Sequence, residues 1–162
     1  MWIVAKIKHN QYSIFKDSLS KLIKDKTEIY FPKMSLQKNK KNIVRNLLGT
    51  YIFCFNENFN KKDIKSFQHL KGLNYFLDNS FGNQKDIRNF ILFCKSFENK
   101  QGILNSNFFL NLRSKNLQFI NGPLKNLFFK ILQVDKNKIF AEVNNNKKII
   151  INKENCHQFL SN

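Results

Sequence analysis

The chain has few of the residues that mark several protein classes. Its three cysteines, Cys54, Cys94 and Cys156, are far apart and odd in number, which argues against a disulfide framework and fits a reducing compartment. No uncharged apolar run reaches about 18 residues, which argues against a membrane span. The N-terminus enters strand-like sequence directly, without a signal-peptide pattern. We therefore expect a cytoplasmic, monomeric protein that does not associate with membranes.

Acidic residues are also scarce. The 162 residues contain 11 Asp and Glu against 28 Lys and Arg, which gives a formal net charge of +17. Clustered cations of this kind supply the sequence-independent part of nucleic-acid affinity. Only Arg45, Arg88 and Arg113 are arginines, however, and arginine is the side chain best suited to specific phosphate and base contacts. The charge is thus either a nucleic-acid-binding property or a compositional bias toward Lys, Asn, Ile and Phe.

Motifs for catalysis are missing from the sequence. It shows no paired carboxylates at a plausible site, no glycine-rich phosphate loop and no Ser or Cys nucleophile beside a histidine. Cys156 and His157 are adjacent, but no second pair stands at the spacing of a zinc site. We expect a protein that is not an enzyme and that holds neither metal nor cofactor.

The first hundred residues predict strands and helices in alternation. Apolar residues recur at three- and four-residue steps between Tyr12 and Ile23 and again between Ile87 and Phe97, which predicts two amphipathic helices. The expected elements are a strand at 2–7, a helix over 12–23, strands at 27–31 and 47–55, a helix over 61–70, a strand at 73–77 and a helix over 83–97. This order predicts an α/β sandwich in which helices cover a small sheet.

The stretch 47–55 is the most strand-like in the chain. It is rich in aromatic and β-branched residues and carries no charge, which favours a central strand. Alternation places Ile52 and Cys54 on one face and Tyr51, Phe53 and Phe55 on the other. At least one of these faces should belong to the core.

A basic segment precedes this strand. Residues 33–45 contain no acidic residue and carry Lys38, Lys40, Lys41 and Arg45. Such a segment is either a solvated hairpin or loop, or an arm that contacts DNA or RNA. Both interpretations stay open on the sequence alone.

The character of the chain changes after residue 99. The stretch 99–107 is rich in Asn, Gln, Gly and Ser and predicts a linker. Short strands are predicted at 117–120, 128–134, 138–143 and 148–151, separated by turn sequences, as in a small barrel. The expected fold is α+β, with domains at 1–100 and 113–162 and a linker at 101–112. A helical hairpin is the alternative for the C-terminal segment, because its apolar residues from Leu124 to Leu132 also follow a helical spacing.

The turn at Gly122-Pro123-Leu124 resembles a KOW motif. An apolar strand precedes it and a second strand and turn follow, as in that motif. The glycine permits a tight turn and the proline fixes φ between the strands. Asn126 stands where the motif has a second glycine, and asparagine tolerates the left-handed conformation that this position needs. The resemblance implies an SH3-like β-barrel.

The rest of the chain is similar to the NusG amino-terminal domain. Trp2-Ile3-Val4 resembles the opening Trp-Tyr-Val strand of that family, and residues 47–55 resemble its Leu-Phe-Pro-Gly-Tyr-Ile-Phe-Val strand. Tyr30-Phe31-Pro32 and Lys71-Gly72-Leu73 match two further motifs in the same order. The resemblance implies a mixed sheet with helices, joined by a linker to the KOW barrel.

The resemblance also implies a transcription elongation or antitermination factor. The partner is RNA polymerase, whose large-subunit clamp helices would dock on an apolar patch of Leu48, Tyr51 and Phe53. The KOW domain would recruit Rho or a small-subunit ribosomal protein, and the factor would contact DNA or RNA in the elongation complex. A general factor and an operon-specific one of the RfaH-like branch both fit. A ribosome- or RNA-binding KOW protein is the alternative function.

Overall fold

The computed structural model describes residues 1–23, 27–112, 117–119, 123–143 and 147–161. Contacts divide the chain into two compact units, which we describe separately. Unit 1 comprises residues 1–31 and 50–93, and unit 2 comprises 32–49 and 94–162. The boundaries of these units differ from those of the predicted domains, 1–100 and 113–162. The predicted domain boundaries stay a prediction.

Unit 1 is built on a four-stranded sheet in the order β2-β5-β1-β6. The elements are β1 (Trp2–Ile7), α1 (Tyr12–Leu22), β2 (Glu28–Tyr30), β5 (Tyr51–Phe55), α2 (Lys61–Ser66), β6 (Leu73–Phe76) and α3 (Gln84–Ser96), with short 3-10 turns at Phe67–His69 and Asp78–Phe81. All three strand pairings are antiparallel. The mixed sheet implied by the family resemblance is therefore wrong for this sheet, although β5 is central as predicted.

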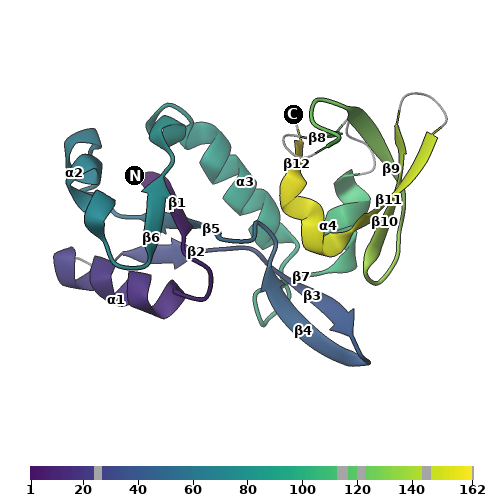
Figure 1. The fold of residues 1–162 in the computed structure, drawn as a ribbon, viewed down its shortest axis with the longest axis horizontal. Helices are drawn as coiled ribbons and strands as arrows, with labels where there is room; N and C mark the ends of the chain where they lie inside the picture. Colours follow the sequence, from purple (N-terminus) through teal and green to yellow (C-terminus); the bar gives the residue numbers. More distant parts are fainter. Residues whose placement is uncertain (24–26, 113–116, 120–122, 144–146, 162) are drawn as a thin grey trace. The chain divides into compact units, whose positions relative to one another are not determined.

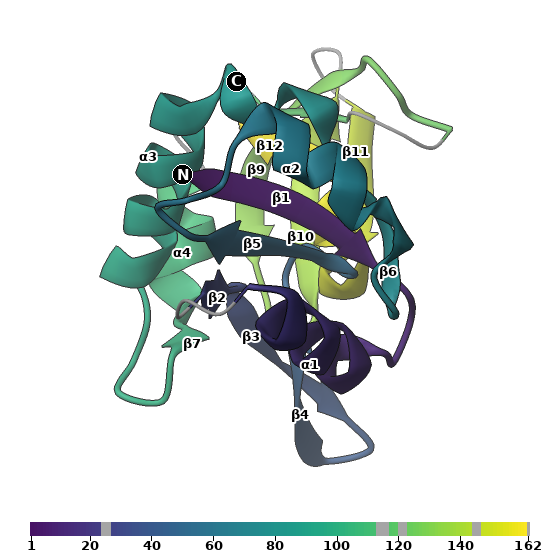
Figure 2. The same cartoon turned by 90° about the vertical axis from the view of Figure 1, so that its left-hand side faces the viewer.

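Helices cover both faces of this sheet. Phe15 and Leu19 of α1 and Ile64 of α2 join one buried cluster with the apolar residues of one sheet face, which include Ile3 and Ile52. Figure 2 shows α1 and α2 in front of β1 and β5. On the opposite face the Phe90 ring of α3 packs 5.7 Å from the Phe53 ring, measured between centroids. The face that carries Phe53 is therefore partly covered by α3.

Side chains from the α3 region also complete the edge of β1. The Trp2 N–H donates to Gln84 Oε1 at 2.9 Å, and Gln84 Nε2 donates to the Trp2 carbonyl at 2.6 Å. The Val4 N–H donates to Ser80 Oγ at 3.1 Å, and Ser80 is buried. The backbone of β1 is thereby satisfied beyond the part that pairs with β6.

Unit 2 contains a three-stranded sheet in the order β4-β3-β7. β3 (Lys33–Lys38) and β4 (Lys41–Asn46) form an antiparallel hairpin, and β7 (Ile103–Leu104) pairs with β3 in parallel. The segment 33–45 is thus a hairpin, one of the two forms weighed from the sequence. It is only partly solvated, because Met34 and Leu36 are buried.

The C-terminal part of unit 2 is a five-stranded antiparallel sheet in the order β11-β10-β9-β8-β12. Its strands are β8 (Leu117–Phe119), β9 (Phe128–Val134), β10 (Lys138–Val143), β11 (Lys147–Asn152) and β12 (Phe159–Ser161), with a 3-10 turn at Lys153–Gln158 (Figure 1). The helical hairpin considered for this segment is therefore not the form adopted. Strand pairing buries Phe129 and Ile131, whereas Phe128 stays exposed.

The segment predicted as a linker carries regular structure. β7 and α4 (Ser106–Asn111) lie within residues 101–112. Leu104, Phe108, Phe109 and Leu112 are all buried. The Asn105 side chain accepts a hydrogen bond from the Asn107 N–H and caps α4. The apolar residues of this stretch give it a place in the core of unit 2.

Candidate functional site

Three side chains form a row across the unit 1 sheet, which we call the tyrosine row. Lys6 of β1 lies directly opposite Tyr51 of β5 and Tyr75 of β6. Directly paired residues point to the same face of a sheet. The Tyr51 and Tyr75 hydroxyl oxygens are 3.2 Å apart, and Lys6 Nζ lies 5.4 Å from one ring centroid and 5.3 Å from the other. Two aromatic rings thus flank one ammonium group.

The two tyrosines of the row differ in acidity. The hydrogen bond with Tyr51, together with the Lys6 ammonium, lowers the pKa of the Tyr75 phenol. The same hydrogen bond, together with partial burial, raises the pKa of Tyr51. These directions fit a Tyr51 hydroxyl that donates to the Tyr75 oxygen. The row therefore has fixed polar tips on large apolar rings.

The two tyrosines of the row are accessible, whereas the neighbouring Phe53 of β5 is covered. Tyr75 is 43% exposed and Tyr51 is half-buried, whereas Phe53 is only 5% exposed. Phe53 lies between the rings of Tyr30 and Phe90, at centroid distances of 6.2 and 5.7 Å. Phe53 is therefore covered by neighbouring rings, whereas Tyr51 and Tyr75 present area to a partner.

Leu48, the third residue of the predicted patch, lies outside the regular strand. It is half-buried in the turn before β5, and its N–H donates to Asn46 Oδ1 at 3.0 Å. Gly49 has φ of +65° in this turn. Leu48 thus precedes the regular pairing of β5 with β1, which begins at Tyr51. Leu48 belongs to unit 2 and Tyr51 to unit 1, and their assignment to one polymerase-binding patch stays a prediction.

The basic residues of the hairpin fall into two groups. Lys38 and Lys41 are directly opposed next to the turn that contains Lys40, and all three are exposed. We call them the hairpin tip. Like charges directly opposite each other repel, so an anion bound between Lys38 and Lys41 would reduce their mutual repulsion. Arg45 pairs with Met34, four residues along β4 from Lys41, and is therefore separated from the tip.

The predicted KOW turn is described only in part. Gly122 lies outside the described residues, and Pro123 and Leu124 are exposed in a turn. Asn126 has φ of +69°, which confirms that it adopts the left-handed conformation expected there. Its N–H donates to the Phe119 carbonyl at 2.7 Å, which closes the turn onto β8.

The described ranges show neither a cluster of metal ligands nor a membrane-spanning helix. In that part of the chain no three His, Cys, Asp or Glu residues come together as a metal site would require. Cys54 is fully buried, and burial raises the pKa of its thiol. None of the described helices combines the length and the hydropathy needed to cross a membrane.

Comparisons with known proteins give structural matches alone. No protein-family model and no curated protein matches the chain. The MjSpt4:Spt5 complex in conformation B matches with 16% sequence identity and a TM-score of 0.32, and the match covers 99% of this chain and 96% of the other. The same complex in conformation A matches with 14% sequence identity and a TM-score of 0.27, and the match covers 99% of this chain and 97% of the other. Thermotoga maritima NusG matches with 12% identity, 98% of this chain, 94% of the matched chain and a TM-score of 0.40. TM-scores at this level do not assign the chain to a family.

Sequence reasoning missed two members of the tyrosine row. Lys6 and Tyr75 lie far from Tyr51 in sequence, and only the strand order and register bring the three together. Alternation places Tyr75 on the face opposite the buried Phe76, but it does not say which strand lies beside it. The available signal was an unexplained tyrosine next to a core phenylalanine.

Proposed function

We propose that the chain is a transcription elongation factor of the NusG type, which docks on RNA polymerase through the tyrosine row. The observation that carries the proposal is the open pair Tyr51 and Tyr75 around Lys6. Tyr51 lies in the strand whose sequence resembles the polymerase-binding strand of that family. The proposed partner is the clamp-helix region of the large polymerase subunit.

The chemistry of the row suits a protein partner. Tyrosine supplies a large, rigid apolar area with one polar tip, and it is among the residues that dominate binding energy at interfaces. Lys6 adds a cation at the centre, and its contact with the Tyr75 hydroxyl raises the pKa of its ammonium group. We propose a helix surface that offers an apolar side chain to the rings and a carboxylate to Lys6. The activity is binding, without catalysis.

Unit 2 would supply further contacts. The hairpin tip carries three exposed cations in a segment without acidic residues, which suits DNA or RNA phosphates in the elongation complex. The five-stranded sheet is the region that resembles a KOW domain, and we propose that it recruits a second protein, either Rho or a small-subunit ribosomal protein.

A ribosome- or RNA-binding KOW protein is the second candidate function. The observation that favours it is the same hairpin tip, together with the net charge of +17. In that function the tyrosine row would have no polymerase to bind, and nucleic acid would carry all of the association.

Capture of partners from nuclease-treated lysate separates the two functions. We expect tagged full-length chain to retain RNA polymerase subunits after nuclease treatment. Lys6→Glu should abolish the capture, because it reverses the charge at the centre of the row, while Lys16→Glu, an exposed position on α1, should leave it unchanged. Loss of all captured protein on nuclease treatment would instead support the RNA-binding function and refute polymerase docking.

A further inference from the structure

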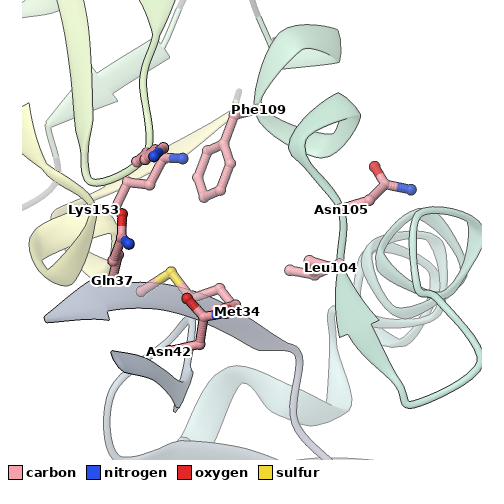
Figure 3. A pocket seen from close by; sticks show the side chains of 9 residues that line it. Met34, Gln37, Asn42, Leu104, Asn105, Phe109 and Lys153 are labelled. Carbon is pink, nitrogen blue, oxygen red and sulfur yellow. The ribbon is translucent and has the colours of Figure 1, made fainter. Parts of the chain in front are cut away.

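A cavity of about 460 Å³ lies within unit 2 (Figure 3). Its volume is in the range of about 300–1,000 Å³ that is usual for ligand pockets. The hairpin provides one wall, and β7, α4, the turn before β10 and the 3-10 turn after β11 provide the others. The lining residues are Met34, Ser35, Gln37, Asn42, Leu104, Asn105, Phe109, Lys136 and Lys153.

Lys153 is the unusual member of this lining. It is only 7% exposed, although lysine is rarely buried to this degree. Its Nζ lies 4.9 Å from the centroid of the Phe109 ring, and Figure 3 shows the two side chains side by side at one wall of the cavity. The aromatic face attracts the ammonium group and holds it beside the cavity.

Asn137 ties this wall to the hairpin. The Gln37 N–H donates to Asn137 Oδ1 at 2.9 Å, and Asn137 Nδ2 donates to the Gln37 carbonyl. The Asn137 carbonyl accepts from the Lys153 N–H at 2.9 Å. One residue of the turn between β9 and β10 therefore fixes both the hairpin strand and the start of the segment that carries Lys153. The cavity walls are thus joined by hydrogen bonds of the Asn137 side chain and of its backbone carbonyl.

The lining groups match the parts of a nucleotide. Met34, Leu104 and Phe109 are buried apolar residues that line the floor of the cavity. Asn42 and Gln37 carry amides, which can donate to and accept from a base edge. The nine described lining residues include two lysines and no acidic residue, so an anionic phosphate meets no repulsion there.

We propose that this cavity receives one nucleotide, with its base edge toward the amides of Gln37 and Asn42 and its phosphate toward Lys153. The hairpin tip supports this choice of ligand, because Lys38 and Lys41 lie on the same two strands that line the cavity through Gln37 and Asn42. A single strand whose phosphates run along the tip can place a neighbouring nucleotide in the cavity. The proposal concerns unit 2 and goes beyond polymerase docking by the tyrosine row.

The test is the affinity of the full-length chain for a labelled single strand of about ten nucleotides, measured by fluorescence anisotropy. Lys153→Met removes the charge and keeps an apolar stem, and we expect affinity to fall at least about tenfold. Its matched control is Lys148→Met, which removes an exposed charge from β11 and should cost about twofold or less. Lys153→Arg should restore most of the binding.

A second variant keeps the test decisive if Lys153→Met does not fold. Asn42 is exposed, so Asn42→Ala should fold, and loss of its amide contact should weaken binding about two- to tenfold. Asn152→Ala, at an exposed position on β11, is the control and should bind as the unchanged chain does.

Titration with uridine and adenosine monophosphate distinguishes two sources of the same ligand. Binding of the free nucleotides that depends on Lys153 would identify a mononucleotide site. Lys153-dependent binding of the strand alone would identify a site for one nucleotide within a nucleic acid. The proposal is overturned if the cavity variants bind strand and free nucleotides as their controls do.

Discussion

Replacing Gly72 with alanine should destabilise unit 1 by about 1–5 kcal/mol. Gly72 has φ of +81°, in the left-handed region that side chains disfavour. A Cβ built there would lie 2.8 Å from the Phe15 nitrogen and 2.9 Å from the Gln11 carbonyl oxygen, both backbone atoms at the start of α1. The turn before β6 and the helix would therefore have to move apart.

The magnitude follows from three contributions. A left-handed alanine costs about 1–2 kcal/mol, and overpacking against backbone costs about 1–3 kcal/mol more. Alanine also has less conformational freedom than glycine in the unfolded chain, which offsets about 0.4–1 kcal/mol of this destabilisation. Gly49 provides a comparison, because its φ is +65° but nothing lies within 4 Å of the added Cβ. Gly49→Ala should consequently cost only about 0–1.5 kcal/mol.

Urea unfolding gives the measurement, and Trp2 gives a probe within unit 1. Trp2 is the single tryptophan and lies in β1, so its fluorescence reports unfolding of this unit. Gly82→Ala is the control in the same unit, because Gly82 has no positive φ and its nearest contact is at 3.8 Å. It should be neutral or stabilise slightly. Equal unfolding free energies for the Gly72 and Gly82 variants would refute the packing of α1 on the turn before β6.

Three further predictions concern single groups. Cys54 is buried and burial raises the pKa of its thiol, so alkylation of Cys54 in the native chain should be no faster than unfolding, as mass spectrometry of the labelled peptide would report. As pH rises in an NMR titration, Tyr75 should ionise before Tyr51, because the pKa of Tyr75 is lowered and that of Tyr51 is raised. The lowered pKa of Tyr75 in the folded state also stabilises the fold at high pH, and this stabilisation is lost as pH falls through that pKa. Asn137→Ala removes both hydrogen bonds to Gln37 and should lower the unfolding free energy of unit 2 by about 1–3 kcal/mol, measured by urea and circular dichroism; an unchanged value would contradict the linking role of Asn137.

Much of the local structure followed from the sequence where pattern and turn chemistry agree. The predicted strands at 128–134 and 138–143 coincide with β9 and β10, because Asp135-Lys136-Asn137 gives a clear turn between them. The helical spacing from Leu124 to Leu132 was misleading. Pairing of β9 with two neighbours outweighs that periodicity, since it satisfies the backbone and buries alternate side chains.

The strand at 47–55 was predicted too long. β5 begins at Tyr51, and the turn before it contains Gly49 at φ of +65°. The predicted faces were confirmed within the strand: Ile52 and Cys54 join the core, and Tyr51 and Phe53 lie on the other face. A single sequence cannot give the register with β1, and therefore cannot place Lys6 beside Tyr51.

The linker and the cavity show a second limit of sequence patterns. The polar residues of 99–107 suggested a linker, yet Leu104 within that stretch and Phe108 and Phe109 just after it are buried. Lys153 was not singled out, because one lysine among many in a basic chain carries no local signal. Its burial depends on contacts with α4 and with the turn before β10, both distant in sequence.

The affinity of the purified chain for purified RNA polymerase tests the central proposal most directly. The double variant Leu48→Asp with Tyr51→Ala removes an aromatic anchor and adds a charge, and we expect affinity to fall at least roughly thirtyfold, equivalent to about 2 kcal/mol. Leu22→Asp, an exposed position on α1, introduces the same charge and should leave affinity unchanged. Equal affinities for the double variant, the control and the unchanged chain, with all three folded, would contradict docking through Leu48 and Tyr51.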